Sequence, residues 1–394
     1  MFRHRRLLAF EAVCRYGSAL KAADHIHMAQ PSVTAAITAL EGDVAASLCD
    51  RTSKGMTPTP EGTVFLARVR AALLHLKDAE SLIATRRSDR TRVPLHRLVT
   101  GAQMRALTAV IQAGSFSEAA RRLDLSQPSI HRSVRELETL CGIALIRDQP
   151  TPEARELARY FALYQAELQM GLDEIREIQG RVEGTVTVGA LPLARSGWLP
   201  DAVAATLADY PYARIRIIDG PYEAQLHDLL HGQIDFILGA LRDPVPSKLI
   251  EQRHLFDDPL TIVVRADHPL APGFDSDHDK LTPAQLGSLA WILPRPGTPG
   301  RTVFEQFMAN KGLTPPRRVV ECASLVAARA LLLRTDMAAL LSARQVEYEI
   351  RQGLLKIMGP PLTGSTRSIG ITTRTGFSPT RLHVAMLRQL GLDG

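Results

Sequence analysis

The side chains best suited to chemistry in this sequence lie on one short segment, residues 127–141. Ile130, Val134 and Leu137 recur there at helical spacing and predict a buried face. The opposite face would carry the polar groups of Gln127, Ser129, His131, Arg132 and Arg135. Amide, hydroxyl, imidazole and guanidinium groups hydrogen-bond to base edges and phosphates in the DNA major groove. The pattern therefore predicts recognition of a polyanion, although a small helical bundle with a solvated basic face has the same pattern.

A second segment, residues 30–44, has a similar arrangement, but residues 30–38 carry no charge. Amide and hydroxyl groups that could contact bases or phosphates come from Gln30, Ser32, Thr34 and Thr38. Threonine and alanine methyl groups can also touch the methyl group of thymine. Residues 49–59 then predict a hairpin with a glycine at its turn. From this hairpin Arg51 and Lys54 would reach phosphates or the minor groove.

The two segments belong to an internal duplication. Four motifs of the first copy are Gly17-Ser18, Ala22-Ala23, Gln30-Pro31-Ser32 and Leu40-Glu41. They recur 97 positions later as Gly114-Ser115, Ala119-Ala120, Gln127-Pro128-Ser129 and Leu137-Glu138. A single ungapped offset over four motifs indicates duplication of a whole unit.

Both copies resemble the winged helix-turn-helix of LysR-type transcriptional regulators, in which the same motifs follow an apolar helix. A member of that family ordinarily has one such unit, so the duplication departs from the pattern. The second copy has also lost five residues of its hairpin, because Pro60-Glu61 corresponds to Pro152-Glu153 at an offset of only 92. The resemblance implies that the long helix after each unit is a linker helix, which pairs with its counterpart in a dimer.

The basic charge is concentrated in the first copy. The 394 residues have a net charge of +6, and residues 1–97 contain 15 Lys and Arg against 9 Asp and Glu. Residues 98–182 contain 10 against 11. This excess points to a polyanion at the first copy, although a charge of this size also simply aids solubility.

The whole pattern predicts a multi-domain chain, with two tandem all-α winged helix-turn-helix modules and one α/β domain. Alternating β-rich and helical segments from residue 184 onwards predict a parallel sheet. Landmarks of the family's two-lobed, periplasmic-binding-protein-like (type 2) effector domain are matched at 184–189, 210–211, 232–235 and 268–271. The expected boundaries are 1–60 for the first module, 61–97 for its linker helix and a basic linker, 98–152 for the second module and 153–182 for its linker helix. The effector domain is expected at 183–394. Within it, lobe I would comprise 183–258 and 357–394, and lobe II 259–356.

The effector site is expected in the cleft between the lobes, where loops after strands converge. One wall would contain Pro192, Arg195 and Ser196, and the other Pro294, Gly297, Thr298 and Arg301, with Ser324 at the start of another helix. Helix N-termini and two arginines favour a carboxylate or phosphate, although each Ser or Thr serves equally well as a helix cap. Residues 291–302 resemble the branch of the family that regulates sugar and aromatic-acid catabolism, which implies a sugar, sugar acid or aromatic acid as effector.

The sequence contains no nucleophile elbow, HExxH motif, phosphate loop or cysteine pair at metal-ligand spacing. We therefore expect no enzyme activity, no cofactor and no metal. The four cysteines offer no obvious partner for a redox switch. There is neither a signal peptide nor a run of about 18 apolar residues, so we expect a cytoplasmic protein without membrane contact.

These observations together predict a sequence-specific, DNA-binding transcriptional regulator that senses a small molecule. Its partners would be double-stranded DNA, the effector and a second copy of the chain in a homodimer or homotetramer; RNA polymerase is implied by the resemblance. The second module would supply more base readout and the first more phosphate contact. The alternative is a ligand-binding oligomeric protein in which one or both helical modules serve assembly or non-specific DNA binding.

Overall fold

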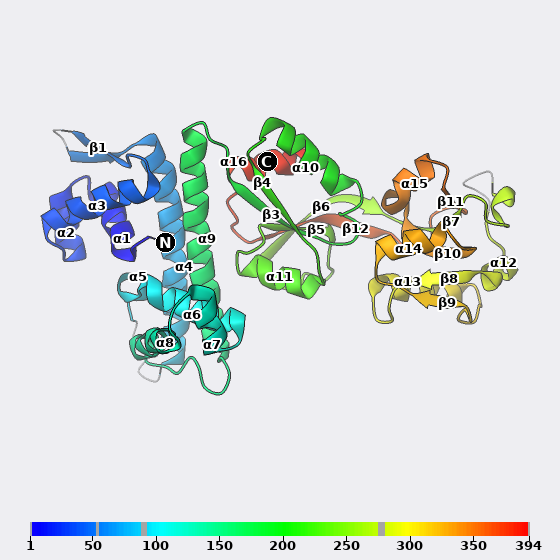
Figure 1. The fold of residues 1–394 in the computed structure, drawn as a ribbon, viewed down its shortest axis with the longest axis horizontal. Helices are drawn as coiled ribbons and strands as arrows, with labels where there is room; N and C mark the ends of the chain where they lie inside the picture. The colour runs from blue at the N-terminus through cyan, green and yellow to red at the C-terminus, as the bar shows by residue number, and fades with distance from the viewer. Residues whose placement is uncertain (1, 53–54, 88–92, 275–279, 393–394) are drawn as a thin grey trace.

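The structure, a computed structural model, describes residues 2–52, 55–87, 93–274 and 280–392. A helical N-terminal half and two α/β lobes follow one another along the long axis of the molecule (Figure 1). Lys54, expected at the tip of the first hairpin, lies outside the described residues.

The helical half contains two similar units. The first consists of α1 (His4–Tyr16), α2 (Ala19–Ile26), α3 (Gln30–Val44) and a hairpin of β1 (Cys49–Thr52) and β2 (Gly55–Pro58). The second consists of α5 (Leu95–Leu98), α6 (Gly101–Ala113), α7 (Phe116–Leu123) and α8 (Gln127–Cys141). Helices end at residues with positive φ at Gly17, His27 and Ala45 in the first unit and at Gly114, Asp124 and Gly142 in the second. These positions are again 97 apart, so the units share backbone geometry as well as sequence.

The glutamate of each Leu-Glu motif fixes the chain that follows the third helix. Glu41 Oε1 accepts hydrogen bonds from the backbone N–H groups of residues 48 and 49, at 2.9 and 3.2 Å. Glu138 Oε1 does the same for residues 145 and 146, at 2.8 and 3.0 Å. A carboxylate that accepts two backbone hydrogen bonds holds this turn in place, so the motif is structural in both units.

The hairpins of the two units differ, as the lost residues predict. In the first unit β1 and β2 pair antiparallel, and the Met56 N–H donates a hydrogen bond to the Gly17 carbonyl at 2.9 Å. This bond seats the hairpin on the end of α1. In the second unit the corresponding segment makes one isolated bridge between Ile146 and Pro150.

Each unit is followed by a helix of 27 residues, α4 (Pro60–Arg86) and α9 (Pro152–Ile178). Both begin with proline in the first turn, and the hydroxyls of Thr59 and Thr151 each accept a hydrogen bond from the backbone N–H three residues later. The two helices pack side by side within the chain (Figure 1). Despite their length, neither these nor any other helix in the described ranges is apolar enough to span a membrane.

Lobe I contains a five-stranded sheet with the order β4-β3-β5-β12-β6. β3 is parallel to β4 and β5, whereas β12 is antiparallel to β5 and β6, so the sheet is mixed rather than wholly parallel. Its strands are β3 (Thr185–Ala190), β4 (Arg214–Ile218), β5 (Phe236–Ala240), β6 (Ile250–Asp258) and β12 (Arg367–Arg374), and its helices are α10 (Trp198–Asp209), α11 (Tyr222–Leu230) and α16 (Arg381–Gln389).

Lobe II contains a second five-stranded sheet with the order β11-β7-β10-β8-β9, in which β8 is parallel to β9 and β10. Its strands are β7 (Leu260–Arg265), β8 (Ala290–Leu293), β9 (Val319–Glu321), β10 (Met337–Ser342) and β11 (Leu355–Ile357). Its helices are η1 (Ala271–Gly273), α12 (Pro283–Ser288), α13 (Pro299–Asn310), α14 (Leu325–Leu332), η2 (Ala343–Val346) and α15 (Glu347–Arg351).

Two further features of the lobes differ from the sequence expectations. The pattern does not predict β6, because this edge strand is largely polar and only partly buried. The chain also returns to lobe I later than residue 357, since Met358 and Leu362 belong to the core of lobe II and lobe I resumes with β12 at Arg367.

Lobe I rests directly on α9. Gly232, after α11, lies so close to α9 that a Cβ there would be 3.1 Å from Ala166 Cβ and 3.3 Å from Leu163 Cδ2. At the end of α9, Glu177 Oε1 accepts a hydrogen bond from the Leu382 N–H at 3.4 Å. The effector domain therefore contacts the same helix that pairs with α4.

Candidate nucleic-acid interface and ligand site

The outer face of α8 is open to solvent. All five predicted contact residues on it are exposed: Gln127, Ser129, His131, Arg132 and Arg135. Arg132 has no ion-pair partner within the described ranges, so its guanidinium is available for a phosphate or a guanine edge. Arg135 is instead engaged, because its Nη1 lies 3.0 Å from Glu138 Oε2.

The first turn of α8 contains a residue that the sequence analysis missed. Ser126 is the N-cap, and its hydroxyl accepts a hydrogen bond from the Ser129 N–H at 3.3 Å. The hydroxyls of Ser126 and Ser129 are also 2.7 Å apart. Ser129 thus belongs to the cap as well as to the exposed face, and a serine directly before Gln127-Pro128 is a signal that could have identified it.

The outer face of α3 carries uncharged polar groups. Gln30, Ser32 and Thr38 are exposed and Thr34 is partly buried. Arg51 Nη2, from β1, lies 3.4 Å from the Thr38 hydroxyl and links the hairpin to the helix. The structure therefore groups the described DNA-contact candidates of this unit on one surface.

Two cysteines of the first unit are neighbours, although their spacing of 35 residues gives no indication of it. Cys14 in α1 and Cys49 in β1 are both free thiols. The hydrogen bond between them raises the pKa of Cys14 and lowers the pKa of Cys49. Burial raises the pKa of Cys14 further. Folding thus supplies the neighbouring thiol that the sequence analysis did not find.

The predicted effector residues lie in loops at the carboxyl edges of the two sheets. They follow β3 (Pro192, Arg195 and Ser196), β8 (Pro294, Gly297, Thr298 and Arg301) and β9 (Ser324). These three strands are parallel to their neighbours, so the loops take the position where ligands bind in open α/β sheets.

The two predicted arginines already have carboxylate partners. Arg301 Nε lies 2.7 Å from Glu305 Oε1, and its Nη1 lies 3.5 Å from Glu321 Oε1. Arg195 Nη1 lies 3.0 Å from Asp219 Oδ2. An anionic effector would have to compete with these carboxylates at either arginine.

The predicted hydroxyl groups are engaged locally. The Thr298 hydroxyl donates to the Arg295 carbonyl at 2.8 Å, and the Ser324 hydroxyl accepts from the Ala327 N–H at 3.3 Å. Ser324 is therefore the N-cap of α14, which is the structural alternative that the sequence left open.

A cavity of about 350 Å³ is lined by residues of both lobes, including the predicted Ser196. Trp198 and Phe256 form one wall, with ring centroids 5.2 Å apart and planes at 80°. The Arg344 guanidinium carbon, from η2, lies 4.2 Å from the centroid of Phe256. Aromatic rings and a cation suit a flat anion. The sequence analysis missed Phe256 because it lies on the unpredicted β6, whereas the position of Arg344 after β10 could have pointed to it.

Comparisons with known proteins agree with this architecture. The sequence matches the family described as bacterial regulatory helix-turn-helix protein, lysR family, over residues 4–63 and again over 102–155. It matches the LysR substrate binding domain over residues 179–391. The chain belongs to the LysR family of transcriptional regulators. It is therefore a DNA-binding regulator with an effector-binding domain, which is the function that the sequence predicted.

Similar proteins differ in how much of this LysR-family chain they cover. The HTH-type transcriptional regulator GalR of Pseudomonas putida is 33% identical over 384 residues, which are 96% of this chain and 94% of GalR. The regulator PcaQ of Agrobacterium fabrum is 27% identical over 296 residues, 73% of this chain and 92% of PcaQ. A full-length, singly substituted OxyR of Pseudomonas aeruginosa has the same fold, with a TM-score of 0.53 at 20% identity over 74% of this chain and 94% of OxyR.

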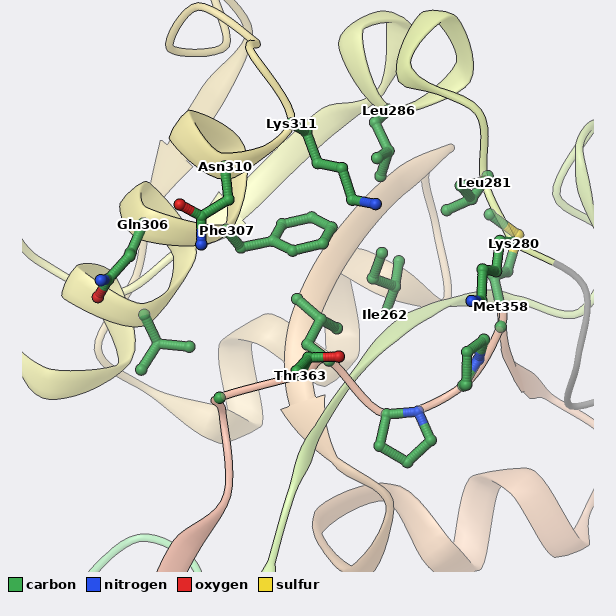
Figure 2. Close-up of a pocket in the computed structure, with 16 residues that line it drawn as sticks. Ile262, Lys280, Leu281, Leu286, Gln306, Phe307, Asn310, Lys311, Met358 and Thr363 are labelled. Atoms are coloured by element: carbon green, nitrogen blue, oxygen red, sulfur yellow. The ribbon is translucent and has the colours of Figure 1, made fainter.

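The LysR substrate binding domain contains a second cavity, of about 410 Å³, within lobe II. It lies between α12, α13 and residues 358–364. Figure 2 shows the side chains of Phe307 and Lys311 on one side and those of Ile262 and Lys280 on the other. None of these residues was predicted, and the cavity is distinct from the one that contains Ser196.

Proposed function

We propose that both helical units of this LysR-family regulator act as winged helix-turn-helix modules and contact double-stranded DNA with divided roles. In this proposal α8 supplies base readout through His131 and Arg132, while α3 and the first hairpin supply phosphate contact, with Arg51 and Lys54. The observation that supports it is that α3 and α8 both bury their apolar face and leave the polar face open. The free guanidinium of Arg132 supports base readout by α8, and the positive net charge of residues 1–97 supports phosphate contact by the first unit.

Arg132→Ala and Lys54→Ala test this division of roles. We expect Arg132→Ala to relax sequence preference at one part of the site, because a bidentate contact to guanine is worth about 1–3 kcal/mol of discrimination. We expect Lys54→Ala to weaken binding to all sequences alike and to reduce the salt dependence by about one unit of slope. Titration of labelled duplexes at several salt concentrations measures both effects, with Arg334→Ala in lobe II as a control of equal charge. Unchanged affinity and salt slope for Lys54→Ala would remove the role given to the first hairpin.

We also propose that an acidic small molecule, a sugar acid or an aromatic acid, binds between the lobes of a periplasmic-binding-protein-like domain. Ser196 and Arg344 would contact its polar groups, and Trp198 and Phe256 its flat body. The support is that Arg344 stacks on Phe256, whereas Arg195 and Arg301 are held by carboxylates.

A thermal-shift screen with benzoate and gluconate tests the ligand site. We expect one of these probes to raise the unfolding temperature of the wild type, and Arg344→Met to abolish that rise. Arg334→Met, an exposed arginine of the same lobe, is the control. An equal rise in Arg344→Met and wild type would place the ligand elsewhere, for example at Lys280 and Lys311.

Effector binding would act by linkage, because a ligand that prefers one arrangement of the lobes shifts the population of DNA-binding geometries. We propose that the regulator works with RNA polymerase at a promoter, as a homodimer or homotetramer. A homodimer would already contain four helical units. Tight, salt-sensitive but sequence-blind DNA binding by the wild type would instead favour an architectural role with non-specific DNA binding.

A further inference from the structure

The long helices α4 and α9 form an antiparallel pair within one chain (Figure 1). Arg86 Nε, at the end of α4, lies 3.2 Å from Glu153 Oε1, at the start of α9. Phe65, near the start of α4, contacts Gly171, near the end of α9. One helical unit lies near each end of this pair (Figure 1). The partner that the family resemblance placed in a second chain is thus supplied by the duplication.

A buried cluster of charges holds the pair together. Only 4% of the Arg68 side chain, from α4, is exposed. Its Nη1 lies 3.1 Å from Glu167 Oε2 and its Nη2 lies 2.5 Å from Glu174 Oε1, both from α9. The cluster therefore joins one helix that supplies the cation to another that supplies the carboxylates.

Neither helix could form this cluster with a second copy of itself. Equivalent residues of α4 and α9 are 92 positions apart. By this offset Tyr160 replaces Arg68, while His75 and Leu82 replace Glu167 and Glu174. A pair of two α9 helices would bury two carboxylates opposite Tyr160 instead of Arg68. A pair of two α4 helices would replace both glutamates with His75 and Leu82, and would leave Arg68 only Asp78, which takes the place of Met170. A buried charge that has lost its partner is strongly destabilising, so the cluster selects against a pair of two α9 helices.

The shape of the contact favours the same pairing. A Cβ added at Gly171 would lie 2.8 Å from the ring of Phe65, which is closer than real Cβ contacts. The equivalent residue in α4 is Ala79, which carries such a Cβ. Two α4 helices in this register would therefore collide where α4 and α9 fit.

We propose that one chain is a complete DNA-binding unit for two unlike half-sites in a fixed order, and that chains associate through surfaces other than α4 and α9. The α3 half-site would contain thymines, because the α3 face offers methyl, hydroxyl and amide groups. The α8 half-site would contain guanine, the base that suits Arg132 and His131. The inference rests on the proposed function only in requiring that both units contact DNA.

Cross-linking of the full chain tests the pairing without DNA. In the Arg86→Cys/Glu153→Cys variant, a short bis-maleimide should join the two thiols. The product should have single-chain mass on a denaturing gel, and mass spectrometry of its digest should show the two cysteine peptides linked to each other. A product of two-chain mass would overturn the proposal, because it would show that α4 pairs with α9 of another chain. Absence of a cross-link, when both thiols react with a monofunctional maleimide, would overturn it as well. The two single variants control for the half-buried Cys14 and Cys322.

Selection of bound duplexes from a random DNA library tests the order of the half-sites. We expect the wild type to select a motif in which neighbouring halves differ. Arg132→Ala should lose about tenfold preference in one half and Gln30→Ala in the other. A palindromic pair of halves, both relaxed by Arg132→Ala, would contradict the proposal. If neither variant alters the motif while the cross-link stays within one chain, the divided DNA roles fail and the helix pairing stands.

Discussion

At the scale of single residues, the two units have diverged mainly at their helix ends. The N-cap of α8 is Ser126, whereas the equivalent N-cap of α3 is Ala29, which makes no side-chain cap. The residue after α8 is Gly142, whereas the residue after α3 is Ala45, held at φ 53° and ψ 40°. Left-handed backbone is unfavourable for any residue with a Cβ. The ends of α3 are therefore weaker than the ends of α8.

Ala45→Gly should stabilise the end of α3 by about 1 kcal/mol, because glycine removes the left-handed strain at the price of some entropy in the unfolded chain. Hydrogen exchange of the last turn of α3 should slow about fivefold. Gly142→Ala is the reverse substitution at the equivalent position and should speed exchange at the end of α8. Faster exchange in Ala45→Gly would mean that the backbone there is not strained.

At the scale of elements, the pairing of α4 and α9 depends on charges that burial disfavours. Burial raises the pKa of Glu167, and the Arg68 guanidinium acts in the opposite direction. Arg68 offsets only part of the effect of burial, so the pKa of Glu167 stays above its ordinary value. Each charge of the cluster is therefore tolerated only while its partner is present.

Arg68→Met should weaken the α4–α9 pair by about 3–5 kcal/mol near pH 8, because buried carboxylates lose their cation. Without Arg68 the pKa of Glu167 rises further, so the variant takes up a proton at a higher pH than the wild type. The loss of stability relative to the wild type should therefore be complete above that raised pKa. It should shrink as the pH falls towards 4.5, the ordinary pKa of a glutamate. Hydrogen exchange of α4 and α9 at pH 8 and pH 5.5 measures the change.

Arg70→Met, which removes an exposed arginine two residues along the same helix, is the control. It should change exchange little at either pH, because an exposed ion pair contributes at most about 1 kcal/mol. A deficit in Arg68→Met that is independent of pH would indicate lost packing rather than an uncompensated carboxylate.

At the scale of the whole molecule, lobe I is connected to both long helices. Arg374 of β12 donates from Nη1 to the carbonyls of Leu229 and Ile234, at 2.9 and 2.7 Å. Burial lowers the pKa of Arg374, and the carboxylates of Asp235 and, to a smaller extent, Glu167 counteract this. Because Glu167 also binds Arg68, buried charges extend from lobe I through α9 to α4. A movement of lobe I would therefore act on the helix pair that positions the two helical units.

Gly232→Ala should loosen lobe I from α9. The substitution strains a backbone at φ +68° and also places a Cβ 3.1 Å from Ala166. Gly353→Ala in lobe II is a matched control, because its φ is +67° and its Cβ would meet nothing within 4 Å. Both should cost about 1 kcal/mol of strain, but only Gly232→Ala should speed hydrogen exchange in α9 around residues 163–166. Equal exchange of α9 in the two variants would argue against coupling through this contact.

The sequence by itself determined the parts of this protein that depend on local physics. Helical periodicity and the Gln-Pro-Ser motif placed α3 and α8 over residues 30–44 and 127–141, which are their observed bounds. A constant offset between motifs revealed the duplication, because repeats are visible without folding. The loss of five residues likewise predicted the reduced hairpin of the second unit.

Only the tertiary structure decided which distant residues meet. The partner of α4 is α9 of the same chain, Cys14 lies beside Cys49, and Arg344 rather than Arg301 presents its guanidinium to the cavity that contains Ser196. Each of these contacts joins segments far apart in sequence, and its energy comes from burial and charge pairing that exist only once the chain is folded. Periodicity and caps act within a few residues along the chain, and for that reason they could not reveal these contacts.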